Sequence, residues 1–212
     1  MTELQLRAAI CEVGRRLWQT GLVGGTEGNI SCRLSARQLL VTPSGMSKGH
    51  MRPDDLVVTD LKGLPIKDGQ ASSEIKLHTV IYQHREDCMA IVHAHPPVAT
   101  GFALAGEEIP DNLLPEAALV LGSVATVPFA LTGTDEVPQA IEPLVYDHKT
   151  FLLSHHGAVT MGKDVYDALY RMETLERVAS VIQHAKTIGV PRPMPDYAFD
   201  FLLENALTGK LD

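Results

Sequence analysis

The sequence is poor in cysteine and in positive charge. Its three cysteines, Cys11, Cys32 and Cys88, are odd in number, lie far apart and form no Cys-x-x-Cys pair. This usage argues for a reducing compartment and against a disulfide-linked fold. Lysine and arginine number 18 against 26 aspartates and glutamates, which gives a formal net charge of -8. We therefore expect neither nucleic acid nor an acidic membrane as a partner.

Long apolar runs are absent as well. No stretch of 18 apolar residues occurs, so the sequence predicts no transmembrane helix. The N-terminal residues lack the basic start, apolar centre and small-residue cleavage site of a signal peptide. Together with the cysteine usage, this predicts a cytoplasmic protein. The length of 212 residues, with 45% hydrophobic and 21% charged residues, fits one globular domain, which we expect to span residues 1–212.

Hydrophobic periodicity predicts helices and strands along the whole chain. We expect helices over residues 2–20, 73–86, 98–105, 135–146, 165–188 and 197–207. We expect strands over residues 30–34, 38–42, 56–59, 125–127 and 150–153, and a further strand that ends at His93 and His95. Early hairpins and later helices indicate an α/β fold with a mixed, largely antiparallel sheet and helices on both faces.

The stretch Ala-Ile-Val-His-Ala-His-Pro-Pro, residues 90–97, carries the strongest functional signal. His93 and His95 are two residues apart, so on a strand both side chains point to the same face. The two prolines end the strand directly afterwards. Paired imidazoles at a strand end predict a divalent metal site, which needs at least one more ligand. A second apolar run ends in His155 and His156, and its spacing does not choose between these two histidines.

Other polar groups at the predicted strand and helix ends complete a candidate site. Glu74 lies in the first turn of the helix predicted over residues 73–86, where an acid also simply complements the helix dipole. The hydroxyl, amide and backbone donors that suit an anion are Asn29, Ser44, Gly45, Ser72 and Ser73. A Lewis acid beside a base beside an anion site suits proton abstraction next to the carbonyl of a phosphorylated substrate.

Five motifs in this order resemble the class II aldolase/adducin family, and the L-fuculose-1-phosphate aldolase type in particular. They are Gly-Thr-x-Gly-Asn at 25–29, Thr-Pro-Ser-Gly at 42–45, Ser-Ser-Glu at 72–74, His-x-His at 93–95 and His-His-Gly at 155–157. The resemblance runs from the first helix to the long helix ending near residue 188. It implies a three-layer α/β/α fold around a mainly antiparallel sheet. It also implies a homotetramer with its sites at subunit interfaces.

The resemblance also implies a role for each matched residue. His93, His95 and His155 would be zinc ligands, with Mn2+ or Co2+ as alternative ions, since imidazoles suit several divalent metals. Glu74 would be the catalytic acid/base and a candidate metal ligand in the empty site. The residues that would hold the substrate phosphate are Asn29, Ser44, Gly45, Ser72 and Ser73. The reaction would be cleavage of a ketose 1-phosphate to dihydroxyacetone phosphate and an aldehyde.

The sequence departs from the fuculose-1-phosphate aldolase pattern at one place. The family tyrosine that follows an Ile-Pro segment is missing, since residues 109–116 read Ile-Pro-Asp-Asn-Leu-Leu-Pro-Glu. Glu116 could replace it, or serve the loop alone, and Tyr197 is a weak match for the family's C-terminal tyrosine. The substrate could then be a different sugar phosphate, such as 5-deoxyribulose 1-phosphate.

Three alternative functions remain open from the sequence. A sugar-phosphate 4-epimerase of the same family usually carries Asp where this chain has Glu74, and a decarboxylase is a third enzyme class. A non-catalytic oligomerisation module like the adducin head belongs to a different class of protein. That module is expected to lose the metal histidines, which this sequence keeps.

Overall fold

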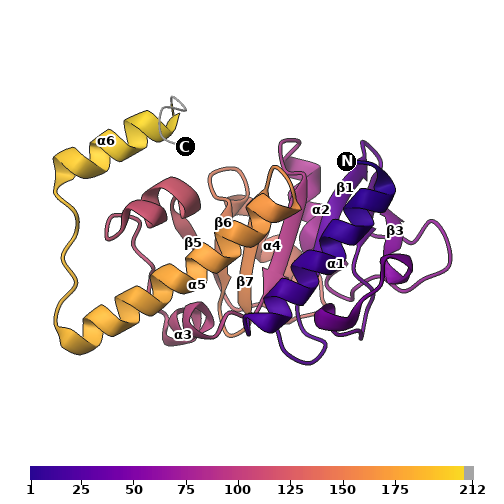
Figure 1. Ribbon diagram of the computed structural model, residues 1–212, viewed down its shortest axis with the longest axis horizontal. Helices are drawn as coiled ribbons and strands as arrows, with labels where there is room; N and C mark the ends of the chain where they lie inside the picture. The colour runs from indigo at the N-terminus through magenta and orange to yellow at the C-terminus, as the bar shows by residue number, and fades with distance from the viewer. Residues whose placement is uncertain (208–212) are drawn as a thin grey trace.

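The computed structural model describes residues 1–207, and a seven-stranded sheet forms its centre (Figure 1). The strand order across the sheet is β3-β2-β1-β4-β7-β6-β5. The strands are β1 (Asn29–Ser35), β2 (Gln38–Val41), β3 (Val57–Asp60), β4 (Ala90–Ala94), β5 (Val124–Val127), β6 (Thr150–Leu153) and β7 (Gly157–Gly162). All neighbouring pairs are antiparallel except β5 and β6, which run parallel. The prediction of a largely antiparallel mixed sheet is therefore confirmed.

Helices cover both faces of this sheet. They are α1 (Glu3–Gln19), α2 (Ile75–His84), α3 (Pro97–Ala105), α4 (Glu136–Ile141), α5 (Val165–Ile188) and α6 (Asp196–Leu207). Short 3-10 turns lie at η1 (Lys48–His50), η2 (Pro53–Asp55) and η4 (Glu142–Leu144), and a π-helical turn forms η3 (Ala117–Leu121). Figure 1 shows α1 and α5 across the near face of the sheet, with α6 reached through an extended segment.

Two separate hydrophobic cores hold the three layers together. One core joins α1, α3 and α5 to one sheet face, with Val13, Leu169 and Val92 among its buried residues. The other joins α2 and α4 to the opposite face, with Ile81 and Phe151 among its members. Alternate strand residues point to opposite faces, so β2, β4, β6 and β7 each contribute buried residues to both cores. This is the three-layer α/β/α arrangement that the resemblance implies.

Most predicted elements form, and their ends follow local chemistry. Helix α1 begins with a capping box in which the Thr2 side chain accepts from the Gln5 N–H and the Gln5 side chain accepts from the Thr2 N–H. Helix α5 matches its predicted range, and Asp164 caps it by accepting from the N–H groups of Tyr166 and Asp167. The predicted helix over 135–146 is shorter, since α4 ends at Ile141 and gives way to a 3-10 turn. Strand β7 was not predicted, and it fills the space between β4 and β6.

Two further expectations bear on the surroundings of the protein. Over residues 1–207, no helix combines the length and the apolar character needed to cross a membrane. All three cysteines are buried free thiols in the part of the chain that the structure describes.

Candidate metal and carboxylate site

The candidate residues gather at one edge of the sheet because of its strand order. Asn29 begins β1 and lies directly opposite His93 near the end of β4. The turn between β6 and β7 carries His155 and His156 to the same edge. The loop after β2 and the segment before α2 meet there through a bridge between Pro43 and Ala71. Segments far apart in the sequence thus line one cavity of about 650 Å³.

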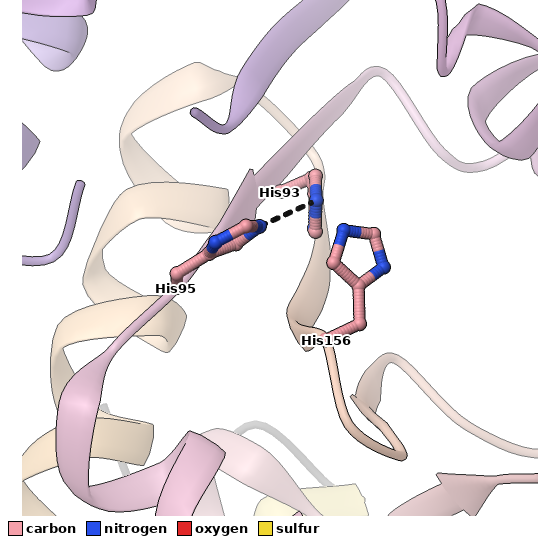
Figure 2. Close-up of side chains that lie close together, drawn as sticks. All are labelled: His93, His95 and His156. Carbon is pink, nitrogen blue, oxygen red and sulfur yellow. Dashed lines mark hydrogen bonds between the residues drawn. The ribbon is translucent and has the colours of Figure 1, made fainter. Parts of the chain in front are cut away.

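Three histidines converge in this cavity. The rings of His93, His95 and His156 face one another, with centroids 4.7 to 5.0 Å apart (Figure 2). One nitrogen from each ring lies within 4.8 Å of the corresponding atoms of the other two. His93 Nε2 and His95 Nε2 lie 3.3 Å apart, at hydrogen-bond distance. The cluster could hold a metal ion, since three nitrogen ligands with an open position are the usual set of a catalytic zinc site.

The structure corrects the choice of the third histidine. His156 lies with His93 and His95, whereas His155 turns away and sets its ring edge-on to Phe129 at 5.8 Å between centroids. His155 adopts a left-handed backbone with φ of 59°, and it is the one non-glycine residue with positive φ among residues 1–207. That conformation redirects the chain before Gly157, so the second histidine points inward. His155 still lines the mouth of the cavity.

The Nδ1 atoms of His93 and His95 have partners outside the group, and their Nε2 atoms point toward each other. His93 is fully buried, and its Nδ1 lies 2.9 Å from the carbonyl oxygen of Ala158. His95 Nδ1 lies 3.3 Å from a carboxylate oxygen of Glu27. Burial lowers the pKa of His95 to about 4, with further lowering by His93 and His156. A neutral imidazole at neutral pH is the form that binds metal ions.

Glu74 places a carboxylate against the histidine group. Its Oε1 lies 3.1 Å from His156 Nε2 and its Oε2 lies 3.3 Å from His93 Nε2. Asn29 Nδ2 donates a 2.8 Å hydrogen bond to the same Oε2. Burial acts to raise the pKa of Glu74, but hydrogen bonds from His156 and His93 outweigh it and hold the pKa well below its usual range. The side chain is therefore an oriented carboxylate, suited to bind a cation or to receive a proton.

The predicted anion-binding residues line the other wall of the cavity. Ser44, Gly45, Ser72 and Ser73 all border it. The Ser72 N–H donates to the Thr42 carbonyl at 3.2 Å, which ties the two serine segments together. Helix α2 starts at Ile75, two residues later than predicted, and Ser72 Oγ accepts a hydrogen bond from the Glu74 N–H at 3.3 Å. Hydroxyl groups just before a helix N-terminus are suited to an anion.

Asn29 has a more specific place than its predicted phosphate contact. It is buried and lines the cavity, but its amide nitrogen is bonded to Glu74. Its Oδ1 is buried without a hydrogen-bond partner. The amide nitrogen of Asn29 is therefore engaged by the Glu74 carboxylate. The amide oxygen that is left over is an acceptor, and a phosphate, which also accepts, cannot bond to it.

Two charged residues of the cavity were missed by sequence reasoning. Glu27 contacts His95 as described, and Lys48 is 2% exposed on η1. Lys48 Nζ donates to the carbonyls of Thr26, at 2.9 Å, and of Met46, so it joins the loop before β1 to the loop after β2. Burial lowers the pKa of Lys48 to about 8, against the attraction of Glu74 and Glu27. Neither residue shows a sequence spacing that would have revealed it.

The two candidates for the missing tyrosine lie elsewhere in this chain. Glu116 borders a different cavity, with Tyr170 and Glu173. Tyr197 on α6 is 78% exposed. Among the described residues, the wall beyond the histidines is formed by Thr132, Gly133 and His155.

Fold and site together define an α/β protein with a histidine group that could hold a metal beside an oriented carboxylate. The class II aldolase and adducin N-terminal domain family matches residues 8–182. The 3-oxo-tetronate 4-phosphate decarboxylase of Haemophilus influenzae is 30% identical over 185 residues, 85% of this chain and 88% of that protein. The L-fuculose phosphate aldolase of Methanococcus maripaludis strain S2 is 32% identical over 170 residues, 80% of this chain and 92% of that protein.

A solved structure agrees with this assignment. YgbL of Klebsiella pneumoniae, described by the alternatives aldolase, epimerase and decarboxylase, superposes with a TM-score of 0.89 at 31% identity. The superposition covers 95% of this chain and 99% of that one. The chain belongs to the class II aldolase/adducin family, whose enzymes are metal-dependent.

Proposed function

We propose that the protein is a metal-dependent aldolase that cleaves a ketose 1-phosphate to dihydroxyacetone phosphate and an aldehyde. L-Fuculose 1-phosphate and 5-deoxypentulose 1-phosphates are substrates of the right class. The observation that carries the proposal is the placement of Glu74. Its carboxylate lies between the histidine group and the serine wall, and Asn29 holds it there. Retention of this arrangement argues against a non-catalytic, adducin-like module.

His93, His95 and His156 would hold the metal, with zinc as the proposed ion and Mn2+ or Co2+ as alternatives. The donor set fits, since three imidazole nitrogens converge and the Nδ1 atoms of His93 and His95 have partners of their own. A bound divalent ion supplies a Lewis acid that polarises the substrate carbonyl and stabilises negative charge on its oxygen.

The protein side chains would bind the substrate phosphate and transfer the protons. Ser44, Ser72 and Ser73 would bind the phosphate through their hydroxyls, and the start of α2 adds favourable electrostatics. Glu74 would take up the proton that the substrate hydroxyl loses as the carbon–carbon bond breaks. It would then return a proton to the carbon that keeps the bonding electrons, as a positioned acid/base.

Decarboxylation is a second candidate. It is favoured by the similarity to the Haemophilus influenzae decarboxylase and by the polar wall of Thr132 and His155 beyond the histidines. Loss of carbon dioxide from a 3-oxo acid leaves the same kind of electron pair next to a carbonyl. The two reactions differ in the fragment that departs and in proton transfer, because aldol cleavage releases a hydroxyl proton to Glu74, whereas decarboxylation releases none and the carbon takes its proton from solvent, by way of Glu74 or directly.

Product analysis separates the candidates. The enzyme is incubated with a panel of ketose 1-phosphates and with 3-oxo-tetronate 4-phosphate, each with and without a chelator. Chelator-sensitive release of dihydroxyacetone phosphate supports the aldolase. Chelator-sensitive release of carbon dioxide from the 3-oxo acid supports the decarboxylase. A change of configuration without fragmentation would instead support an epimerase.

We also propose that the chain acts in the cytoplasm as a homotetramer with sites at subunit interfaces. Three buried free thiols fit a reducing compartment. Exposed aromatic side chains on α6, Tyr197 at 78% and Phe201 at 58%, offer apolar surface for a neighbouring subunit. Light scattering coupled to size-exclusion chromatography measures the assembly, and a monomer at assay concentrations would contradict it.

A further inference from the structure

Glu27 has its carboxylate fixed on two sides. Oε2 lies 3.3 Å from His95 Nδ1, and Oε1 accepts a hydrogen bond from the backbone N–H of Gly24. The backbone N–H of Glu27 donates in turn to the Gly24 carbonyl at 3.1 Å. Residues 24–27 thus close into a turn that aims one carboxylate oxygen at one ring nitrogen.

The loop that carries Glu27 is attached directly to the end of β4. The His95 N–H donates to the Leu22 carbonyl at 2.9 Å. Gly28 has φ of +70° and packs so closely that a Cβ there would lie 2.8 Å from the His93 carbonyl oxygen. On the other side, Lys48 Nζ holds the Thr26 carbonyl at 2.9 Å. The position of Glu27 relative to His95 is therefore set by the backbone and by more than one anchor.

Glu27 contacts His95 on the side of the ring that points away from the other two histidines, which we call the outer side. His95 directs Nε2 toward His93 Nε2, 3.3 Å away, and directs Nδ1 toward Glu27. Glu74 approaches the group from the inner side, where it contacts the Nε2 atoms of His93 and His156. The two carboxylates therefore cannot exchange roles. A carboxylate that accepts from the outer nitrogen of a metal-binding histidine fixes its tautomer and raises its basicity.

We propose that Glu27 is a positioning residue that sets metal affinity through His95. Its carboxylate lies 3.3 Å from Nδ1, where it favours a proton on that nitrogen and so holds the ring with Nε2 presented to the ion. The inference rests on the proposed metal site, and it assigns to the glycine-rich loop a task separate from phosphate binding. Outer partners of this kind alter metal affinity by about 10- to 100-fold.

The test measures zinc affinity of the metal-stripped, full-length protein by competition with a chelator of known affinity. Glu27→Gln and Glu27→Ala both remove the charge that faces His95. Glu142→Gln is the matched control, since Glu142 Oε1 contacts His84 Nε2 at 2.9 Å and lies outside the cavity. Thermal unfolding of the metal-free proteins and the absorption spectrum of the Co2+ forms are recorded in parallel.

We expect both Glu27 variants to bind zinc about 10- to 100-fold more weakly than the wild type, with an altered Co2+ spectrum. We expect Glu142→Gln to match the wild type in both readouts. Unchanged metal-free unfolding temperatures in the Glu27 variants would separate a positioning effect from a loss of structure. Wild-type affinity in either folded Glu27 variant would overturn the inference while leaving the metal site intact. Failure of the wild type to bind any divalent metal would overturn both.

Discussion

His156 Nε2 lies 3.1 Å from Glu74 Oε1, so the second histidine of the His-His-Gly motif joins the Glu74 carboxylate to the histidine group. The first histidine, His155, points its ring at Phe129 instead. Three groups of residues follow one another across the cavity. The serine wall lies on the β2 side of the sheet, the histidines are central, and Thr132 and Gly133 follow β5 at the far side.

Mutation of the two adjacent histidines, His155 and His156, should have different effects on zinc affinity. We expect His156→Ala to weaken zinc binding by more than ~100-fold, beyond the range for outer partners, because it removes a ligand nitrogen. His155→Ala should keep zinc affinity near that of the wild type. Metal content after dialysis against a weak chelator measures the difference. The reverse pattern would return His155 to the ligand set and contradict the geometry described above.

Glu74→Gln should separate metal binding from chemistry. The substitution keeps the shape of the side chain and the histidine ligands, so we expect retained metal content. Turnover should fall at least ~100-fold, the scale for a positioned acid/base. Glu12→Gln is a suitable control, since Glu12 contacts Tyr166 on the surface at 2.6 Å. Near-normal turnover in the Gln variant would remove Glu74 from the mechanism.

Features with a strong local signal could be predicted from the sequence. His93 and His95 share a face because they are two residues apart on a strand, and α5 follows a long apolar stripe. Alternating strands and helices gave the layered α/β class. The serine segments could be assigned to an anion site by residue type, although the start of α2 was placed two residues early.

Features that depend on tertiary contacts could not be predicted. Adjacent residues of a turn point in different directions, and the backbone φ of His155 decides which histidine faces inward. Strand β7 begins directly after that turn, and the sequence pattern of its residues does not predict a strand. Glu27 and Lys48 take their roles from partners brought close by folding, His95 and Thr26, and no sequence spacing marks those contacts.

Lys48 should make anion binding depend on pH. Burial lowers its pKa to about 8, so the side chain is mainly an ammonium at pH 7 and mainly a neutral amine at pH 9. The second pKa of a phosphate monoester is about 6, so its phosphate is largely a dianion over this range and the attraction weakens as pH rises. We expect the dissociation constant for a phosphate monoester such as glycerol 1-phosphate, measured by calorimetry, to increase between pH 7 and 9.

The Lys48 prediction has a matched pair of variants. Lys48→Gln should bind the phosphate monoester more weakly at pH 7 and show little further change up to pH 9. Lys76→Gln should behave like the wild type, because Lys76 is exposed and paired with Asp135 at 2.6 Å. An equal pH dependence in wild type and Lys48→Gln would assign the titration to another group.

Gly28→Ala should damage both stability and metal binding, because this glycine lets the loop before β1 pack on the end of β4. Its φ is +70°, and an added Cβ would lie 2.8 Å from the His93 carbonyl oxygen and from Val23 Cγ1. Strain of this kind costs about 1–3 kcal/mol of unfolding free energy, measured by denaturant titration of the metal-free protein.

Gly101→Ala is the control for Gly28→Ala. Gly101 lies within α3 and a Cβ there meets nothing within 4 Å, so we expect a gain of about 0.4–1 kcal/mol in unfolding free energy. Zinc affinity should fall in the first variant only, because displacing the loop moves Glu27 away from His95. If Gly28→Ala were as stable as the wild type and bound zinc equally well, the loop would be free to shift without disturbing the histidines.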